Sequence, residues 1–187
     1  MTIDERLRQR ILILDGAMGT KIQSLGLSAD VYHRGRFAQW PVSLAGNNDV
    51  LCLTAPEVIA DIHRQYIEAG ADIIATNTFS ANRISQHEYG CERLAREMAY
   101  EGARIAREVA DTHHPSPNTQ IFVAGSMGPT SKSLSLASDM NDPASRGITF
   151  DEMAEAYGEQ AEALIDGGAD LLLIETCFDA LNAKAAL

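Results

Sequence analysis

Four short runs of the chain are nearly apolar throughout, without the alternation of a half-exposed strand. They span 11–14, 72–76, 121–124 and 170–174. Continuous apolar runs of this length are typical of strands that are buried on both faces of a parallel sheet. Apolar residues at helical spacing lie between these runs, so the pattern predicts repeated strand–helix units.

The predicted helices have recognisable ends. Thr54 and Glu57 form a capping box around a proline, and Gly70 stands where the same helix would end. Thr149 and Glu152 form a second capping box. We therefore expect helices to begin after residue 54 and after residue 149, with a third helix between them.

A weak internal repeat relates the predicted strands. Gly-Ala-Asp at 70–72 recurs 98 positions later at 168–170, each time between a helix and a strand. Half that offset, 49, superposes Asn77, Ser126 and Glu175. We expect these three polar residues at equivalent depths, where each strand ends.

Two architectures have equivalent strand–helix units: a doubly wound open sheet and a (βα)8 TIM barrel. Neither GxGxxG after the first strand nor GxxxxGK[ST] occurs, so the nucleotide fingerprints of the open sheet are missing. Barrel chemistry gathers at the carboxyl ends of the strands, where the polar residues fall. A barrel usually needs about 250 residues. Residues 1–187 are therefore expected to supply the first four βα units, the N-terminal half of the domain, with a helix just begun where the chain reaches Leu187.

Composition narrows the functional class. A net charge of −11 disfavours nucleic acid and anionic membrane surfaces as partners. No apolar run approaches the roughly 20 residues of a membrane span, and no signal peptide is visible. Three cysteines without metal-ligand spacing favour a reduced, cytoplasmic protein.

Candidate chemistry begins at the ends of the first two strands. Asp15 precedes Gly16, and a carboxylate beside exposed backbone N–H groups suits the ammonium and carboxylate of an amino acid. A tight turn capped by Asp15 explains the motif equally well. Three hydrogen-bonding residues and an aromatic residue follow the second strand: Thr76, Asn77, Thr78 and Phe79. They suit a pocket wall, or a loop that satisfies its own backbone.

The third and fourth strands end in further polar residues. Ser126 opens a connection that reaches residue 148, and so long a loop is more often functional than idle. Glu175 directly follows four apolar residues. Because an unpaired buried carboxylate is costly, we expect a cationic partner for Glu175, either a substrate ammonium or a structural arginine.

Other reactive residue types carry weaker signals. His63 and the other histidines in helical patterns are expected to be solvated, and Lys132 suits either an anion site or a polar loop. Cys52 and Cys91 are expected to be packing residues, and Cys177 a small buried side chain.

A resemblance to a known family extends nearly from end to end. It is carried by LDGAMGT (14–20), GNNDVLCLTAPEVI (46–59), EAGADIIATNTF (68–79), VAGSMGPTSKSLS (123–135), NDPASRGITFDEM (141–153) and GGADLLLIETCFDALNAKAAL (167–187). These segments resemble the homocysteine-binding module of cobalamin-dependent methionine synthases. The first, third and fourth segments are similar to the wider homocysteine methyltransferase family, and the NDP…ITFD loop resembles the cobalamin-dependent branch.

The resemblance implies a (βα)8 barrel in which homocysteine lies over the strand ends and its thiolate binds zinc. The methyl group would come from methylcobalamin, recharged by methyltetrahydrofolate on other modules of the polypeptide. The implied partners are therefore homocysteine, the remaining barrel half, and the folate and cobalamin modules. Asp15 and Glu175 would lie near the substrate ammonium, residues 76–79 in the pocket wall, and the backbone of 125–128 beside the substrate carboxylate.

Two departures limit what is carried over. Ala75 stands where the family often has glutamate, so no binding role is expected for that position. The family's zinc cysteines belong to the second barrel half, which would lie beyond Leu187, and none of the three cysteines here matches them. We therefore expect no metal ligand or catalytic residue within this chain. Two alternatives remain: a cobalamin-independent enzyme that uses betaine or S-methylmethionine, and a binding fragment without turnover.

Overall fold

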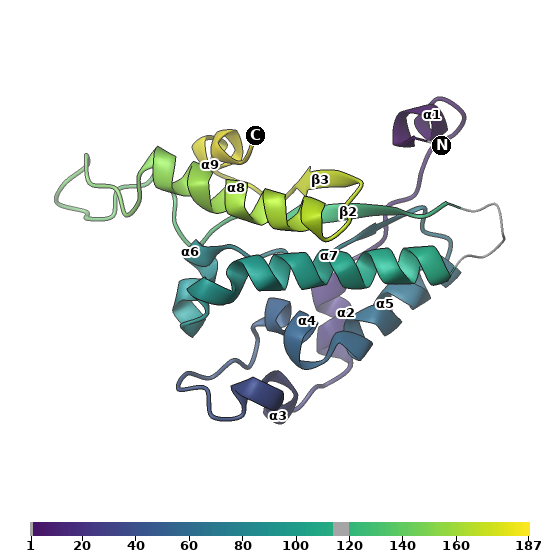
Figure 1. Cartoon of the computed structure of the whole chain (residues 1–187). Helices are drawn as coiled ribbons and strands as arrows, with labels where there is room; N and C mark the ends of the chain where they lie inside the picture. Colours follow the sequence, from purple (N-terminus) through teal and green to yellow (C-terminus); the bar gives the residue numbers. More distant parts are fainter. Residues whose placement is uncertain (1, 114–119) are drawn as a thin grey trace.

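The centre of the molecule is a parallel sheet of three strands in the order β1-β2-β3. The structure is a computed structural model that describes residues 2–113 and 120–187. The strands are β1 (Ile73–Ala75), β2 (Phe122–Met127) and β3 (Leu171–Ile174). The long helices α7 (Ala95–Thr112) and α8 (Phe150–Asp166) run side by side against the sheet (Figure 1). These strands and crossover helices confirm the predicted strand–helix units, and the sheet remains open.

The other elements are short, apart from α5 (Pro56–Glu68). The remaining α-helices are α1 (Ile3–Leu7), α2 (Met18–Ser24), α3 (Ala29–Tyr32), α4 (Leu51–Thr54), α6 (Arg83–Gln86) and α9 (Ala180–Ala186). Single 3₁₀ turns occur at η1 (Gly35–Phe37), η2 (Asn48–Val50), η3 (His87–Tyr89) and η4 (Glu92–Leu94). Within the two described ranges, no helix is both long and apolar enough to cross a membrane.

The helix predicted at the end of the chain is present. Helix α9 begins after its N-cap Asp179, whose side chain accepts the backbone N–H of Leu181. It ends at Ala186, one residue before the last residue, Leu187. The side chain of Leu187 is 96% exposed, so the apolar end of this helix has no cover among the described residues.

One of the two predicted capping boxes forms. The hydroxyl of Thr149 accepts a hydrogen bond from the backbone of Glu152, whose carboxylate accepts one from the backbone of Thr149, so α8 begins as predicted. The prediction for Thr54 was wrong. That residue ends α4 and donates its hydroxyl to the carbonyl of Val50, while α5 follows after Ala55 without a side-chain cap. The chain enters α5 directly from another helix, so Thr54 is already engaged there.

The first predicted strand is reduced to a single bridge. Leu14 pairs in parallel with Ile73, and the Ile13 carbonyl accepts hydrogen bonds from the backbone of Asp72 and Ile73. Ile11 is 88% exposed, because this segment lies at the open edge of the sheet. The expectation of a regular buried strand at 11–14 was therefore wrong, although the segment keeps the parallel direction.

The Gly-Ala-Asp repeat has a structural meaning. Gly70 and Gly168 take the positive φ angles of 105° and 101° that end the helices before β1 and β3. The following aspartates each accept a backbone N–H from the preceding strand segment: Asp72 from Ile13 at 3.0 Å, and Asp170 from Val123 at 2.7 Å. The repeat therefore marks the same local structure at two places. A glycine ends a helix, and the aspartate that follows bonds the new strand to the neighbouring strand segment.

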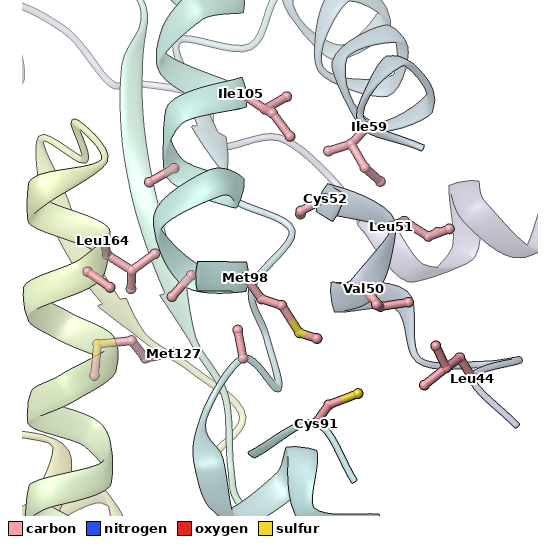
Figure 2. Packing of buried hydrophobic residues seen from close by; sticks show 14 of the residues in the cluster. Leu44, Val50, Leu51, Cys52, Ile59, Cys91, Met98, Ile105, Met127 and Leu164 are labelled. Atoms are coloured by element: carbon pink, nitrogen blue, oxygen red, sulfur yellow. The ribbon is translucent and has the colours of Figure 1, made fainter. Parts of the chain in front are cut away.

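The core lies between the sheet and the helices. Figure 2 shows Met127 of β2 and Leu164 of α8 on one side of α7, and Leu51 of α4 and Ile59 of α5 on the other. All four side chains are almost fully buried. Helix α7 therefore joins the sheet side of the core to the α4–α5 side.

The burial of the strands is uneven. β2 is buried along its whole length, as predicted, whereas Leu172 of β3 is 38% exposed. Within the described ranges β3 pairs with β2 alone, so its second edge and part of its surface have no cover. The expectation that this strand is buried on both faces was wrong.

Candidate functional site

A cavity of about 600 Å³ opens at the carboxyl end of the sheet. It is formed by the segments that follow the strands and by the residues before α4. The sequence-predicted residues that line it are Asp15, Gly16, Thr76, Asn77, Phe79, Ser126 and Glu175. The structure thus brings together residues from the first four predicted units at one end of the sheet.

Asp15 is held against the end of β1. Its Oδ2 accepts a hydrogen bond from the backbone N–H of Ala75 at 2.9 Å, and its own N–H donates to the carbonyl of Ile73 at 2.9 Å. Burial raises the pKa of Asp15 to about 7, and the nearby charge of Glu175 adds to this. An acidic group that is desolvated beside a second carboxylate favours a cationic ligand.

Glu175 stands at the end of β3 and is oriented by the neighbouring strand. The Ser126 hydroxyl donates to Glu175 Oε1 at 2.6 Å, so these predicted site residues are in direct contact. Thr176, directly after Glu175, has φ of 58°. This conformation is a strained one for a β-branched residue, and such strain is concentrated at functional sites. Among the described residues, no arginine or lysine forms an ion pair with Glu175, whose carboxylate accepts hydrogen bonds from the hydroxyls of Ser126 and Thr176 only.

The predicted 49-residue register holds for one pair of strands only. Ile73 pairs with Phe122 at that offset, but Ala124 pairs with Leu171, an offset of 47. Glu175 therefore lies two residues beyond the partner of Ser126, Leu173. Because strand side chains alternate with a period of two, Glu175 still points to the same face of the sheet as Ser126.

Thr78 lies behind the cavity instead of lining it. It is fully buried and donates its hydroxyl to the carbonyl of Ser126 at 2.8 Å. The Thr76 hydroxyl lies 2.6 Å from that of Thr78 and accepts the backbone N–H of Ser126. The amide of Gln160 on α8 donates to the Thr78 carbonyl. Thr78 therefore joins β1 to β2 and α8 from within the core.

Phe79 forms an apolar part of the wall and is 39% exposed. The backbone N–H of Gly128 donates to its carbonyl at 2.9 Å. A Cβ at position 128 would lie 2.6 Å from that carbonyl and 2.8 Å from the ring of Phe79. The glycine is therefore needed for the close approach of the two loops.

Residues 46–49 contribute a further segment of the wall, which was not among the predicted site residues. Asp49 lines the cavity and accepts the backbone N–H of Ser80 at 2.9 Å, while burial raises its pKa to about 6. The Asn48 carbonyl accepts the side-chain amide of Asn77 at 2.7 Å. The sequence does contain a signal for this segment, because Asn47, Asn48 and Asp49 directly precede four apolar residues. Where those apolar residues enter the core, the polar residues before them become partly buried.

The cavity lining is acidic. Asp15, Asp49 and Glu175 contribute carboxylates, and no lysine, arginine or histidine of the described residues lines it. The electrostatic potential of such a cavity favours ligands with a positive group. The paired carboxylates suit an ammonium in particular, which donates three hydrogen bonds.

Comparison with known families agrees with this arrangement. A family model described as homocysteine S-methyltransferase matches residues 12–187. The chain belongs to the homocysteine S-methyltransferase family.

Solved structures support the fold. Two crystal structures of the homocysteine methyltransferase MmuM from Escherichia coli, an oxidised and a metallated form, each match with a TM-score of 0.71 and 24% identity. The alignments cover 96% and 97% of this chain but 57% and 59% of the MmuM chains. The chain therefore spans a little over half the length of these structures, and its open parallel sheet corresponds to part of a TIM-barrel-like fold, as predicted.

The residues that the structure describes do not form the zinc site implied by the family resemblance. Cys52 and Cys91 are buried, and burial raises the pKa of their thiols to about 12 and about 11. Cys177 is only partly buried, because it follows the uncovered strand β3, so the expectation of a buried side chain was wrong there. No cysteine or histidine of the described residues lines the cavity.

A metal would need ligands from elsewhere. The part of the chain described by the structure contains no cluster of three or more metal-ligating side chains. The location of the family's zinc cysteines beyond Leu187 stays a prediction, since Leu187 is the last residue of the chain and of the family match.

His63 differs from its expected role, whereas the segment around Lys132 agrees with the polar-loop alternative. His63 is fully buried in α5, not solvated; burial lowers its pKa to about 4, and neither ring nitrogen has a partner among the described residues. Lys132 is exposed and lies outside the cavity. The loop near it is attached to α9, because Ser133 and Ser135 donate their hydroxyls to Asp179, the N-cap of that helix.

Proposed function

We propose that the cavity binds homocysteine and that the complete polypeptide transfers a methyl group to the homocysteine sulfur. One observation carries this: Asp15 and Glu175, from opposite ends of the chain, face one acidic cavity in a chain of this family. An amino-acid substrate brings the ammonium that such a pair requires. Methylation would convert homocysteine to methionine, with the sulfur acting as the nucleophile.

The proposed binding mode uses groups that are already oriented. The substrate ammonium lies between the carboxylates of Asp15 and Glu175, which Ala75 N–H and Ser126 hydroxyl hold in place. Thr76, Asn77 and Phe79 supply the wall along the rest of the substrate. Gly16 lines the cavity beside Asp15, where it has no side chain to cover its backbone. Thr78 supports this wall from behind and does not touch the substrate.

For the methyl donor we propose methylcobalamin, recharged by methyltetrahydrofolate, with zinc holding the substrate sulfur. The support is the resemblance of residues 141–153 to the cobalamin-dependent branch. In this proposal residues 1–187 form the N-terminal half of the barrel domain of a cytoplasmic methionine synthase. The other barrel half, beyond Leu187, would bring the zinc ligands, and further modules would carry folate and cobalamin. The residues described here supply substrate binding alone.

The acidity of the cavity supports a second candidate. A cationic methyl donor, such as the sulfonium of S-methylmethionine or the quaternary ammonium of betaine, would be attracted by Asp49 as well as by the Asp15–Glu175 pair. The two candidates share the homocysteine site and differ only in the donor.

Calorimetry on the complete polypeptide tests the proposed site. We expect homocysteine to bind, and its analogue without the amino group, 4-mercaptobutanoate, to bind at least about tenfold more weakly, because charge-assisted hydrogen bonds are lost. Equal affinities would contradict the role of the carboxylate pair. Methionine formation from homocysteine with methylcobalamin, S-methylmethionine or betaine, each supplied alone, then identifies the donor.

A further inference from the structure

Cys52 contacts the cavity wall from behind. It lies on α4, outside the cavity lining, and its thiol donates to the backbone carbonyl of Asn77 with a sulfur–oxygen distance of 3.3 Å. The side-chain amide of Asn77 lies 3.5 Å from the same sulfur and donates to the Asn48 carbonyl. The backbone carbonyl and the side-chain amide of Asn77, which lines the cavity, are therefore both held by the segment from Asn48 to Cys52.

The position of Asn77 explains why this contact matters. β1 ends at Ala75, so the sheet offers no ladder partner to the carbonyl of Asn77. Asn77 is only 5% exposed, and Cys52 is the one donor to this carbonyl within the described ranges. A buried carbonyl without a donor is destabilising, so the thiol satisfies a group that would otherwise favour a different loop conformation.

The surroundings of the Cys52 thiol are apolar and closely packed. Cys52 belongs to the apolar cluster between α4 and α7, and Figure 2 shows it on α4, facing α7. Burial keeps the thiol protonated, so it remains a hydrogen-bond donor. On the α7 side, a Cβ at Gly102 would collide with the Thr78 methyl group and lie 3.4 Å from the Cys52 sulfur. Helices α4 and α7 therefore both pack closely against the Asn77–Thr78 segment.

We propose that Cys52 is a positioning residue, which holds Asn77 in the cavity wall and thereby sets the affinity of the cavity for homocysteine. This inference rests on the proposed function for its ligand. It assigns Cys52 more than the packing role expected from the sequence, and it requires neither metal binding nor reactivity of the thiol.

The test compares three variants of the complete polypeptide by calorimetry with homocysteine. Cys52→Ala removes the donor and a single sulfur atom, in a helix that favours alanine, so we expect it to fold. We expect its Kd to rise about fivefold, as for the loss of one neutral hydrogen bond, and Cys52→Ser to restore most of the affinity. Cys91→Ala is the matched control, because Cys91 is equally buried but bonds to the Tyr89 carbonyl, away from the cavity. Its Kd should equal that of the wild type.

Two results would overturn the proposal: a wild-type Kd for Cys52→Ala, or an equal loss of affinity in Cys91→Ala. A second measurement does not depend on the ligand. The side-chain amide signal of Asn77 in a ¹⁵N NMR spectrum should shift in Cys52→Ala and not in Cys91→Ala. If the wild type failed to bind homocysteine, the proposed function would fail, while this signal would still decide whether Cys52 positions Asn77.

Discussion

Asp15 offers the sharpest test of the proposed site, because its raised pKa ties ligand binding to pH. The ammonium of the substrate favours the ionised carboxylate, whereas the buried setting of Asp15 favours the neutral form up to about pH 7. Below that pH the ligand must compete with a proton for Asp15. The affinity for homocysteine is therefore expected to fall as the solution becomes more acidic.

The pKa sets the size of this effect. With a pKa of about 7, one Asp15 in ten is ionised at about pH 6 and nine in ten at about pH 8. The Kd for homocysteine should then be about tenfold higher at about pH 6 than at about pH 8, because the ionised fraction of Asp15 that can bind the ammonium is about ten times smaller at the lower pH. Glu175 raises the pKa of Asp15 while the site is empty, so an ammonium between the two carboxylates releases the proton.

Calorimetry at the two pH values measures this difference in the complete polypeptide. Asp15→Asn is the matched variant: its side-chain oxygen can still accept the N–H of Ala75, but it has no proton to lose. The variant should bind more weakly and show no step in affinity near pH 7. A wild-type Kd that is equal at both pH values would refute the reasoning.

The same pKa predicts a change in stability that needs no ligand. Folded Asp15 retains a proton that the unfolded chain releases near its ordinary pKa, so its favourable contribution is complete below about pH 4 and is lost as the pH rises through about 7. Asp15→Asn should therefore raise the melting temperature at about pH 8 and leave it nearly unchanged at about pH 4. A melting temperature that falls equally at both pH values would contradict the burial argument.

Two further variants and the isolated chain test the site and the fold. Glu175→Gln keeps an acceptor for Ser126 and should preserve the fold, but it should weaken homocysteine binding by about 1.5–3 kcal/mol, the range for hydrogen bonds to charged groups; unchanged affinity with a much lower melting temperature would instead assign Glu175 a structural role. Gly128→Ala should destabilise the protein by about 1–3 kcal/mol in denaturant unfolding, because the new Cβ meets Phe79. The isolated 187-residue chain should self-associate in analytical ultracentrifugation, since the edge of β3 and the exposed Ile11 and Leu172 remain uncovered; a monodisperse monomer with a sharp thermal transition would contradict this.

The chain shows how a cavity is built from local devices that the sequence reveals and from long-range contacts that it does not. Asp15 and Glu175 are 160 positions apart, and each is recognisable alone as a carboxylate at a strand end. Parallel strands place their carboxyl ends on one side, which is why both residues reach the same cavity. The parallel direction of the strands therefore determines where the site lies, independently of the individual side chains.

Several features were determined by the sequence alone. The apolar runs of β1, β2 and β3 and the helical spacing of α7 and α8 predict where strands and helices lie, because this pattern is local. The capping box at Thr149 and the glycine after α5 are also local, because their partners lie within a few residues. For the same reason the polar residues at the strand ends could be named as site candidates.

Other features were decided only by the tertiary structure. Thr78 turns into the core because Ser126 and Gln160, remote in sequence, supply its partners, and Asp49 joins the cavity through the backbone of Ser80. Cys52 reaches Asn77 only because α4 packs against the segment after β1. Hydrophobic periodicity predicts the type of element and its apolar positions, but not which distant groups those positions contact. The hydrogen bonds beyond the strand ends, and the cover over Ile11 and Leu172, depend on those distant contacts.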